Sequence, residues 1–311
     1  MNPCLVGIDV GGTHTRVGLI ARDASLVAAR RWPTPAEPGG AALLEGLADS
    51  IGELLAEHAA GGRPTAIGLA VPGLLDEQRT GVLRAVNLPF LEGVPLGKQL
   101  AERTGCPVTL ETDVAAAAWG EWSALPHRPR RLVFLAIGTG IGAGAILEGR
   151  VVRHTHGGAG HLGQMIVDSS PDAPRGACGT AGCLEAWVSG PALERAARAA
   201  GLASSLTELS AACRQDDGRA NAIVDQAARF LGIGLVNVSS LYAPNAIVIG
   251  GGAARALPEL IGRAGEALRS LGGVLVPPEL EIGASTLGDD AGMIGAALLA
   301  STEGGGRQHA R

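Results

Sequence analysis

The chain has 311 residues, 46% of them hydrophobic and only 3% aromatic, which is enough for two lobes with cores of Ala, Val, Leu and Ile. Its net charge of −5 comes without a block of Lys or Arg, so we expect no nucleic-acid partner. No apolar run reaches the roughly 18 residues that span a bilayer, and the five cysteines form no secreted disulfide framework, so we expect a cytoplasmic protein with reduced thiols and no membrane contact.

The first predicted strand, LVGIDV, runs into a glycine pair and then into a second strand. Gly11 and Gly12 can adopt backbone angles closed to residues with a Cβ, so their N–H groups can turn toward an anion. Thr13 and Thr15 add hydroxyl donors, and the carboxylate of Asp9 could hold a hydrated Mg²⁺ opposite the phosphates. An ordinary glycine hairpin with a surface acid explains this stretch alone equally well.

Apolar periodicity predicts the elements that follow in the first half of the chain. In order they are a strand at Ser25–Arg31, a helix at Ala41–His58, a strand at Ala66–Ala70, a helix at Pro95–Thr104, a strand at Pro107–Leu110 and a helix at Asp113–Trp122. Thr112 or Asp113 is the expected cap of the last helix.

A second strand-turn-strand unit, LVFLAIGTGIGAGAIL, begins at Leu132 and repeats the plan of the first. Two such units far apart in the chain suggest a duplicated architecture with two lobes that face one cleft. The stretch GIGAGA loosely matches a dinucleotide fingerprint, but it continues as a strand and opens no helix. Lys98 is the only lysine and has the wrong spacing for a Walker A loop.

The second half continues with an irregular segment, which we expect to be functional because of its length. The segment spans Arg153–Gly182 and is followed by helices at Cys183–Ala199 and Arg219–Leu241, a strand at Ala246–Ile249 that ends in three glycines, and a helix, a strand and a helix up to Ala300.

Nearly the whole chain is covered by motifs in a fixed order: IDVGGTHTR, VPG, NLP, ETDVAAAAWGE, IGTGIGAGAILEGR, GAGHLGQ, CGTAGCLE, APNAIVIGGG and DDAGMIGAALLA. Together they resemble the ROK family of sugar kinases and repressors, within the actin-like ATPase superfamily. The resemblance implies a two-lobed α/β fold of the ribonuclease H-like type, with five-stranded mixed sheets flanked by helices around a central cleft. We expect an N-terminal lobe at 1–122 joined by a returning helix at 290–301, a C-terminal lobe at 123–289 and a polar tail at 302–311. The first strand starts at Leu5, so we expect no N-terminal helix-turn-helix of the repressor branch.

By this resemblance, the protein transfers the γ-phosphate of MgATP to a sugar hydroxyl, usually at position 6. Asp113 matches the catalytic base of the family, and its place between a buried strand and the first turn of a helix would fix it in space. A plain helix-capping role for Asp113 is the alternative. The implied ATP-binding residues are Gly11, Gly12, Thr13, Gly138, Thr139, Gly140, Gly250, Gly251 and Gly252, with Mg²⁺ held through water by Asp9. The last three glycines could instead form only a turn.

The implied sugar-binding residues are Gly73, Asn87, Thr112, Asp113, His161, Gln164 and Glu185. Three of them depart from the family pattern: Thr112 replaces the usual Asn, His161 the usual Glu, and Gln164 the usual His. Glu185 could alternatively be a solvated helix residue.

We expect no structural zinc. The family's zinc site uses one histidine and three cysteines, and here Gln164 and Gly176 replace the histidine and one cysteine, which leaves Cys178 and Cys183. A site improvised from His154, His156 and His161 is the alternative.

The stretch GHLG around His161 is similar to the GHIG pattern of bacterial N-acetylmannosamine kinases. A carboxylate accepts hydrogen bonds from two adjacent hydroxyls, whereas a neutral imidazole offers one donor and one acceptor. The change suits a sugar whose 2-position carries an acetamido group or an axial substituent, unless His161 is merely a tolerated loop residue. N-acetylmannosamine is therefore the favoured substrate, with glucose, fructose or allose as hexose alternatives. A sugar-binding sensor without catalysis is the alternative of another class, and the resemblance implies a homodimer.

Overall fold

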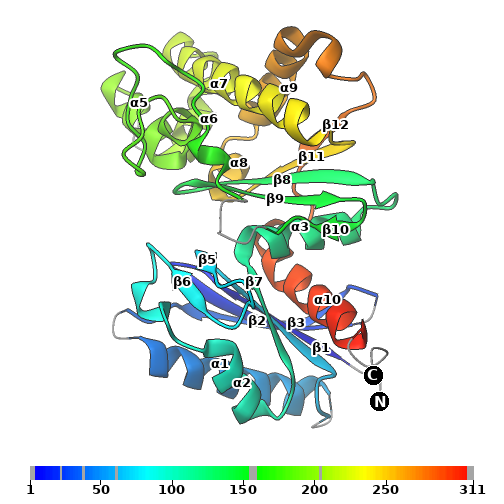
Figure 1. Cartoon of the computed structure of the whole chain (residues 1–311). Coiled ribbons are helices and arrows are strands. Elements are labelled where there is room, and N and C mark those ends of the chain that lie inside the picture. Colours follow the sequence, from blue (N-terminus) through cyan, green and yellow to red (C-terminus); the bar gives the residue numbers. More distant parts are fainter. Residues whose placement is uncertain are drawn as a thin grey trace. The chain divides into compact units, whose positions relative to one another are not determined.

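The computed structural model describes residues 4–21, 23–36, 39–59, 62–153, 160–202 and 205–306. The chain divides into two compact units (Figure 1). The first unit extends to Arg128 and also includes residues 151–153 and the C-terminal part from Asp290 onward, and the second consists of Pro129–Arg150 and residues 160–289. The first unit therefore takes in the loop after its last internal helix, beyond the expected boundary at residue 122.

The first unit contains a five-stranded mixed sheet in the order β3-β2-β1-β4-β7. The strands are β1 (Leu5–Val10), β2 (His14–Ile20), β3 (Leu26–Pro33), β4 (Ala66–Val71) and β7 (Val108–Thr112). β1 to β3 pair antiparallel, whereas β1, β4 and β7 pair parallel. Helices α1 (Gly40–His58) and α2 (Leu96–Thr104) lie on one face of this sheet and α3 (Asp113–Ala124) and α10 (Ala291–Gly306) on the other (Figure 1).

The alternation of side chains along β1 decides what each face of the sheet meets. Val6, Ile8 and Val10 are fully buried in the core that α1 and α2 complete. Gly7 faces α10, where a Cβ atom would lie only 2.0 Å from the carbonyl oxygen of Met293. Asp9 follows on the same face, so its carboxylate is directed toward α10.

The second unit repeats this topology in a sheet with the order β10-β9-β8-β11-β12. Its strands are β8 (Arg131–Ile137), β9 (Ile141–Leu147), β10 (Arg150–Val151), β11 (Ala246–Gly250) and β12 (Glu281–Ala284). β8 pairs antiparallel with β9 and parallel with β11. The α/β fold with two mixed five-stranded sheets is confirmed, and so is the second strand-turn-strand unit.

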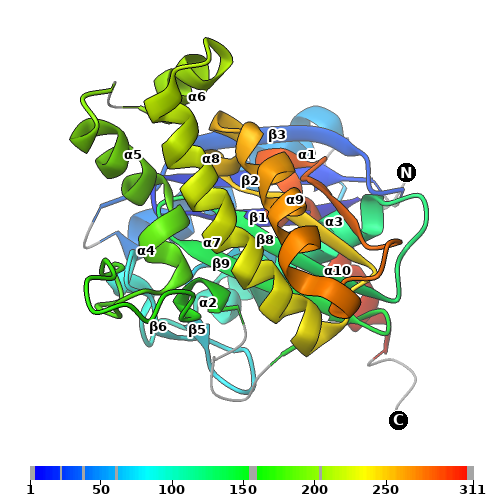
Figure 2. The same ribbon diagram turned by 90° about the horizontal axis from the view of Figure 1, so that it is seen from above.

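The helices of the second unit pack on one another beside its sheet. They are α4 (Leu184–Val188), α5 (Gly190–Ala199), α6 (Leu206–Arg214), α7 (Gly218–Tyr242), α8 (Gly252–Ala256) and α9 (Glu259–Gly272). α7 and α9 lie side by side (Figure 2), and a Cβ atom at Gly232 would be 2.6 Å from that of Ala267. In the described ranges, no helix combines the length and the apolar character that crossing a membrane requires.

Four local predictions were wrong or incomplete. The helix expected at Cys183–Ala199 is interrupted at Ser189, whose extended backbone (ψ 155°) separates α4 from α5. α6 and the small hairpin of β5 (Leu74–Leu75) and β6 (Val82–Arg84) were not predicted. α10 continues to Gly306, so the first residues of the expected tail are helical, while residues 307–311 lie outside the described ranges.

Candidate active site

The glycine turn between β1 and β2 is closed by its own backbone and by the end of β3. Gly11 donates its N–H to the carbonyl of His14 at 3.0 Å, and Thr34 donates its N–H to the carbonyl of Thr13 at 2.9 Å. The Thr34 hydroxyl donates to the carbonyl of Gly11 at 2.6 Å. Gly12 and Thr13 are exposed at the tip of the turn, where an anion could reach them, whereas the N–H of Gly11 shapes the turn.

The prediction that Thr15 donates to a phosphate is wrong. Thr15 is fully buried, and its Oγ1 lies 3.0 Å from the Oγ1 of Thr34. Because the Thr34 hydroxyl gives its hydrogen to Gly11, Thr15 must be the donor in this pair. Thr34 therefore shapes the glycine turn, and the sequence analysis missed it, since nothing in the local pattern marks a contact with a distant turn.

Asp9 lies near two sources of positive charge. Its Oδ2 lies 3.6 Å from Nη1 of Arg16. A Cβ atom at Gly292 would lie 3.1 Å from the Asp9 carboxyl carbon, which places the carboxylate against the first turn of α10, where the helix dipole favours negative charge. A charged carboxylate of this kind suits a hydrated Mg²⁺.

Asn87 lies beside the first glycine turn. A Cβ atom at Gly12 would be 3.5 Å from the Cβ of Asn87, and Asn87 is exposed. Gly73 has a positive φ of 107°, and a Cβ there would meet the carbonyl oxygen of Arg84 at 2.2 Å. Backbone geometry and packing therefore explain the glycine at position 73 without a ligand.

Asp113 stands at the first position of α3, directly after the capping residue Thr112. Its Oδ1 accepts the N–H of Val114 at 2.8 Å, and its side chain is partly exposed. The Thr112 side chain makes no capping hydrogen bond. An acid in the first helical turn is stabilised in its charged form by the exposed N–H groups there.

An ion cluster around the buried Glu111, next to Asp113, was missed. Glu111, at 1% exposure, pairs through Oε1 with Nη2 of Arg79 at 2.6 Å and through Oε2 with Nη2 of Arg153 at 2.9 Å. The sequence analysis recorded Glu111 only as part of a motif. Both arginines lie far from it in the chain, so no spacing rule could have joined them.

The second glycine turn, between β8 and β9, is bonded to the side chain of Glu185 on α4. Gly138 donates its N–H to the carbonyl of Gly140 at 2.9 Å, and Oε2 of Glu185 accepts the N–H of Ile141 at 3.0 Å. A Cβ atom at Gly140 would lie 2.6 Å from that same Oε2. The interpretation of Glu185 as a solvated helix residue is therefore wrong, because its carboxylate is bound to the turn that contains Thr139.

Packing accounts for two of the three glycines after β11. A Cβ atom at Gly250 would be 3.0 Å from the ring of Phe134, and one at Gly251, whose φ is 92°, would be 2.4 Å from the carbonyl oxygen of Ile137. At Gly252 a Cβ atom would meet nothing within 4 Å. Among these three residues, Gly252 is therefore the one with space for a ligand.

His161 caps a single turn of 3-10 helix at Leu162–Gln164, and Gln164 is its last residue. The Gln164 N–H donates to the carbonyl of His161 at 2.9 Å, and both residues are exposed. A Cβ atom at Gly163 would be 2.4 Å from the carbonyl oxygen of Ile141, so this turn packs directly on the start of β9. The second glycine turn, Glu185, His161 and Gln164 thus belong to one neighbourhood of the second unit.

Two thiols of the expected zinc-site region lie close together. Cys178 and Cys183 have their Sγ atoms 3.9 Å apart, and a Cβ atom at Gly176 would be 2.5 Å from Sγ of Cys183. Among the described residues, no three His, Cys, Asp or Glu side chains are grouped to hold a metal, and a closed zinc site needs four ligands. His154 and His156 lie outside the described residues.

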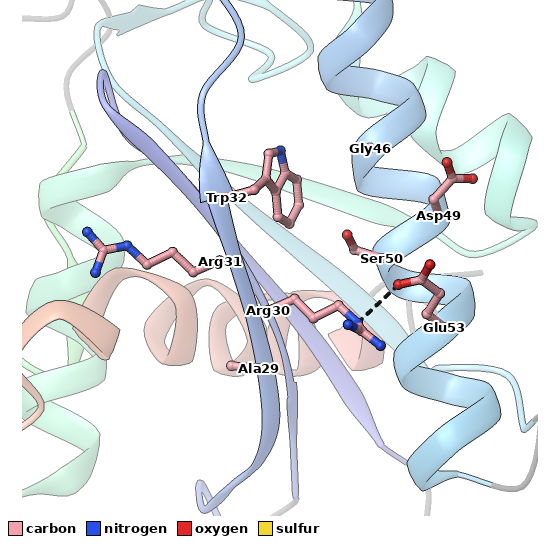
Figure 3. Close-up of a pocket in the computed structure, with 8 residues that line it drawn as sticks. All are labelled: Ala29, Arg30, Arg31, Trp32, Gly46, Asp49, Ser50 and Glu53. Carbon is pink, nitrogen blue, oxygen red and sulfur yellow. Dashed lines mark ion pairs between the residues drawn. The ribbon is translucent and has the colours of Figure 1, made fainter.

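A groove of about 440 Å³ lies between β3 and α1 (Figure 3). Its lining consists of Ala29, Arg30, Arg31, Trp32, Gly46, Asp49, Ser50 and Glu53. Arg30 points to Glu53 on α1, at an Nε to Oε2 distance of 3.2 Å, whereas Arg31 points the other way (Figure 3). None of the expected site residues lines this groove.

Known proteins resemble this chain over nearly its whole length. A family model described as the ROK family matches residues 5–303. An N-acetylmannosamine kinase of Salmonella heidelberg is 31% identical and covers 95% of this chain and 97% of its own length. The crystal structure of a ROK hexokinase from Thermus thermophilus is similar with a TM-score of 0.84 and 37% identity, covering 97% of this chain and 99% of its own. A ROK family glucokinase from Streptomyces griseus, solved with glucose and AMPPNP, is similar with a TM-score of 0.78 and 29% identity, covering 96% and 99%.

The matched motifs, the two repeated sheets and these similarities agree with one another. The chain belongs to the ROK family and is a sugar kinase of that family.

Proposed function

We propose that this kinase transfers the γ-phosphate of MgATP to the 6-hydroxyl of a hexose or an N-acetylhexosamine, with Asp113 as the base. The observation that carries the proposal is the partly exposed carboxylate of Asp113 at the start of α3, held by the end of β7. Asp113 takes the proton of the attacking sugar hydroxyl. The sugar oxygen bonds to the γ-phosphorus while the bond between the γ-phosphorus and the leaving ADP breaks. Positioning supplies much of the catalysis in such transfers.

For ATP, we propose that both glycine turns bind phosphate oxygens. The residues are Gly11, Gly12 and Thr13 in the first turn and Gly138, Thr139 and Gly140 in the second, with Gly250, Gly251 and Gly252 nearer the rest of the nucleotide. The exposed tip at Gly12 and Thr13 and the open space at Gly138 and Gly252 support these roles. Asp9 would hold Mg²⁺ through water, and the ion would offset phosphate charge.

For the sugar, we propose Gly73, Asn87, Thr112, Asp113, His161, Gln164 and Glu185 as the binding residues. Asn87 lies beside a phosphate turn, and Glu185 is bonded to the other one, so a hydroxyl held by either residue would be near the transferred group. At Gly73, the backbone rather than a side chain would make the contact.

N-acetylmannosamine is the proposed substrate, and glucose is the second candidate. The relatives include a kinase named for the first sugar and one solved with the second, both near 30% identity. The exposed imidazole of His161 supports the first, because it offers one donor and one acceptor where a carboxylate offers only acceptors.

The test is kcat/KM for both sugars in the parent and in His161→Glu, measured by ADP release from MgATP. We expect the parent to favour N-acetylmannosamine and the variant to shift toward glucose by at least about tenfold, or 1.4 kcal/mol. A parent that favours glucose, with an unchanged ratio in the variant, would rule out this assignment. His127→Glu, the same substitution at an exposed position outside the proposed site, serves as the matched control and should leave the ratio unchanged.

From the family resemblance we also propose a cytoplasmic homodimer. Light scattering after size exclusion would show twice the mass of the 31.2 kDa chain, and a single-chain mass would contradict the proposal.

A further inference from the structure

Glu111 is a buried acid that the proposed chemistry does not use. It is the second-last residue of β7 and pairs in register with Ala70 of β4. Only 1% of its surface is exposed. Isolated charges are very costly to bury, so the surroundings of this carboxylate explain how it is tolerated.

Both oxygens of Glu111 are engaged. Oε1 accepts the N–H of Thr112 at 2.9 Å and pairs with Arg79, and Oε2 accepts from Nε of Arg153 at 3.0 Å as well as pairing with its Nη2. Arg79 also donates to the carbonyl of Leu110. The negative charge of Glu111 thus lies between two positive charges. The cluster also bonds to the backbone on both sides of Glu111, at Leu110 through Arg79 and at Thr112 through Glu111 itself.

The β5–β6 turn is built to present Arg79. The carboxylate of Asp76 accepts the N–H and the hydroxyl of Thr80, both at 2.9 Å, while the N–H of Arg79 donates to the Asp76 carbonyl at 2.9 Å. Arg79 itself has a φ of 58°, in the left-handed region that costs energy for a residue with a side chain. Backbone strain of this kind persists only where contacts with the surrounding structure hold the residue in place.

An ion cluster around one buried charge contributes little net stability, because desolvation of that charge offsets the attraction between the charges. Its firm contribution is geometric, since it fixes the groups that it joins. Here it joins the β5–β6 turn, Arg153 two residues beyond the end of β10, and the junction of β7 with α3, where Asp113 begins the helix.

We propose that Glu111 is a positioning residue for Asp113. Glu111, held between Arg79 and Arg153, fixes the Thr112 N–H and with it the direction of the Asp113 carboxylate toward the acceptor hydroxyl. The inference rests on the proposed role of Asp113 as the base. A misplacement by about 1 Å at a reacting group can lower turnover about a hundredfold, so this support is a direct determinant of kcat.

The first experiment compares Glu111→Gln with Glu148→Gln. Glu148 also lies between two arginines, Arg130 and Arg131. It is the matched control because it is exposed and lies in the turn between β9 and β10 of the second unit. We expect Glu111→Gln to lower kcat by about 10- to 100-fold with KM for ATP within about twofold, and Glu148→Gln to change neither. A kcat for Glu111→Gln within about twofold of the parent would overturn the proposal.

The second experiment tests whether Glu111 acts through Asp113. In an Asp113→Asn background, where the base is gone, Glu111→Gln should lower the residual turnover by less than about threefold, because residues that act as a unit are not additive. Losses that multiply fully would show that Glu111 acts by another route and would overturn the inference.

Arg79→Gln and Arg153→Gln keep the inference testable if Glu111→Gln does not fold, because each leaves Glu111 one arginine. Both should lower kcat in the parent and have little effect in the Asp113→Asn background. The proposed function fails separately, if Asp113→Asn alone retains parental turnover.

Discussion

The Glu185 carboxylate accepts the backbone N–H of Ile141 at 3.0 Å, so an acid proposed to bind sugar also shapes the second glycine turn. We therefore predict that Glu185→Ala raises KM for both sugar and ATP by about tenfold or more, since it removes a charge-assisted bond. Glu185→Gln keeps an oxygen acceptor for Ile141, so it should affect mainly the sugar. Steady-state kinetics in both substrates would measure this, and equal ATP effects of the two variants would contradict it.

The hydroxyl chain from Thr15 through Thr34 to Gly11 predicts a stability effect that is coupled to ATP. Thr34→Val removes a bond to the glycine turn and leaves the buried Thr15 hydroxyl without its partner, which should cost about 1–3 kcal/mol of unfolding free energy and raise KM for ATP. Thr65→Val is the matched control, because the Thr65 hydroxyl donates to the carbonyl of Cys4 at 3.3 Å in an exposed place. Urea unfolding and ATP kinetics would show whether the variants differ, and equal effects would refute the role of Thr34.

Local packing predicts opposite effects at two glycines, Gly68 under α10 and Gly52 on α1. A Cβ atom at Gly68 would lie 1.8 Å from the carbonyl oxygen of Ala296, so Gly68→Ala should destabilise the protein by about 3 kcal/mol or more. At Gly52, inside α1, a Cβ atom would meet nothing within 4 Å, and Gly52→Ala should stabilise by about 1 kcal/mol. Thermal unfolding would compare them, and a neutral Gly68→Ala would contradict the packing described for α10.

The two neighbouring thiols are predicted to differ in reactivity. A hydrogen bond from Thr180 lowers the pKa of the exposed Cys178, whereas burial raises the pKa of Cys183. A lowered pKa means that more thiolate is present near neutral pH, so the iodoacetamide reaction of Cys178 should level off at a lower pH than that of free cysteine. Peptide mapping by mass spectrometry should show Cys178 labelled before the buried Cys183. Equal labelling rates of Cys178 and Cys183 would contradict this order.

Stoichiometric zinc in the purified protein would contradict the expectation, based on Gln164 and Gly176, that no structural zinc binds.

Local patterns predicted the elements that local physics determines. The apolar runs with glycine turns identified both hairpins, and periodicity identified α1, α3 and α7 within a few residues. The capping box of Ser205 and Glu208 marks the start of α6 in the sequence and was overlooked. The break at Ser189 was hidden because apolar residues continue on both of its sides.

The support of the site could not be predicted in the same way. Thr34 reaches Gly11, and Arg79 and Arg153 reach Glu111, only because the folded sheet brings distant segments together. The motif around Asp113 indicated which residue to propose as the base, but spacing contains no information on which side chains hold it in place. The reason for Gly250 and Gly251 was likewise invisible, since it lies in their packing against Phe134 and Ile137.

The most direct test of the account is the turnover of Asp113→Asn, measured as sugar-dependent ADP release. Asparagine keeps the shape and removes the base, so we predict a loss of at least about a hundredfold in kcat with ATP binding and unfolding free energy nearly unchanged. Asp217→Asn is the matched control, because Asp217 also lies at the start of a helix, as the cap of α7, and it should keep parental turnover. If Asp113→Asn retains kcat within about tenfold of the parent, Asp113 is not the base and the account is wrong.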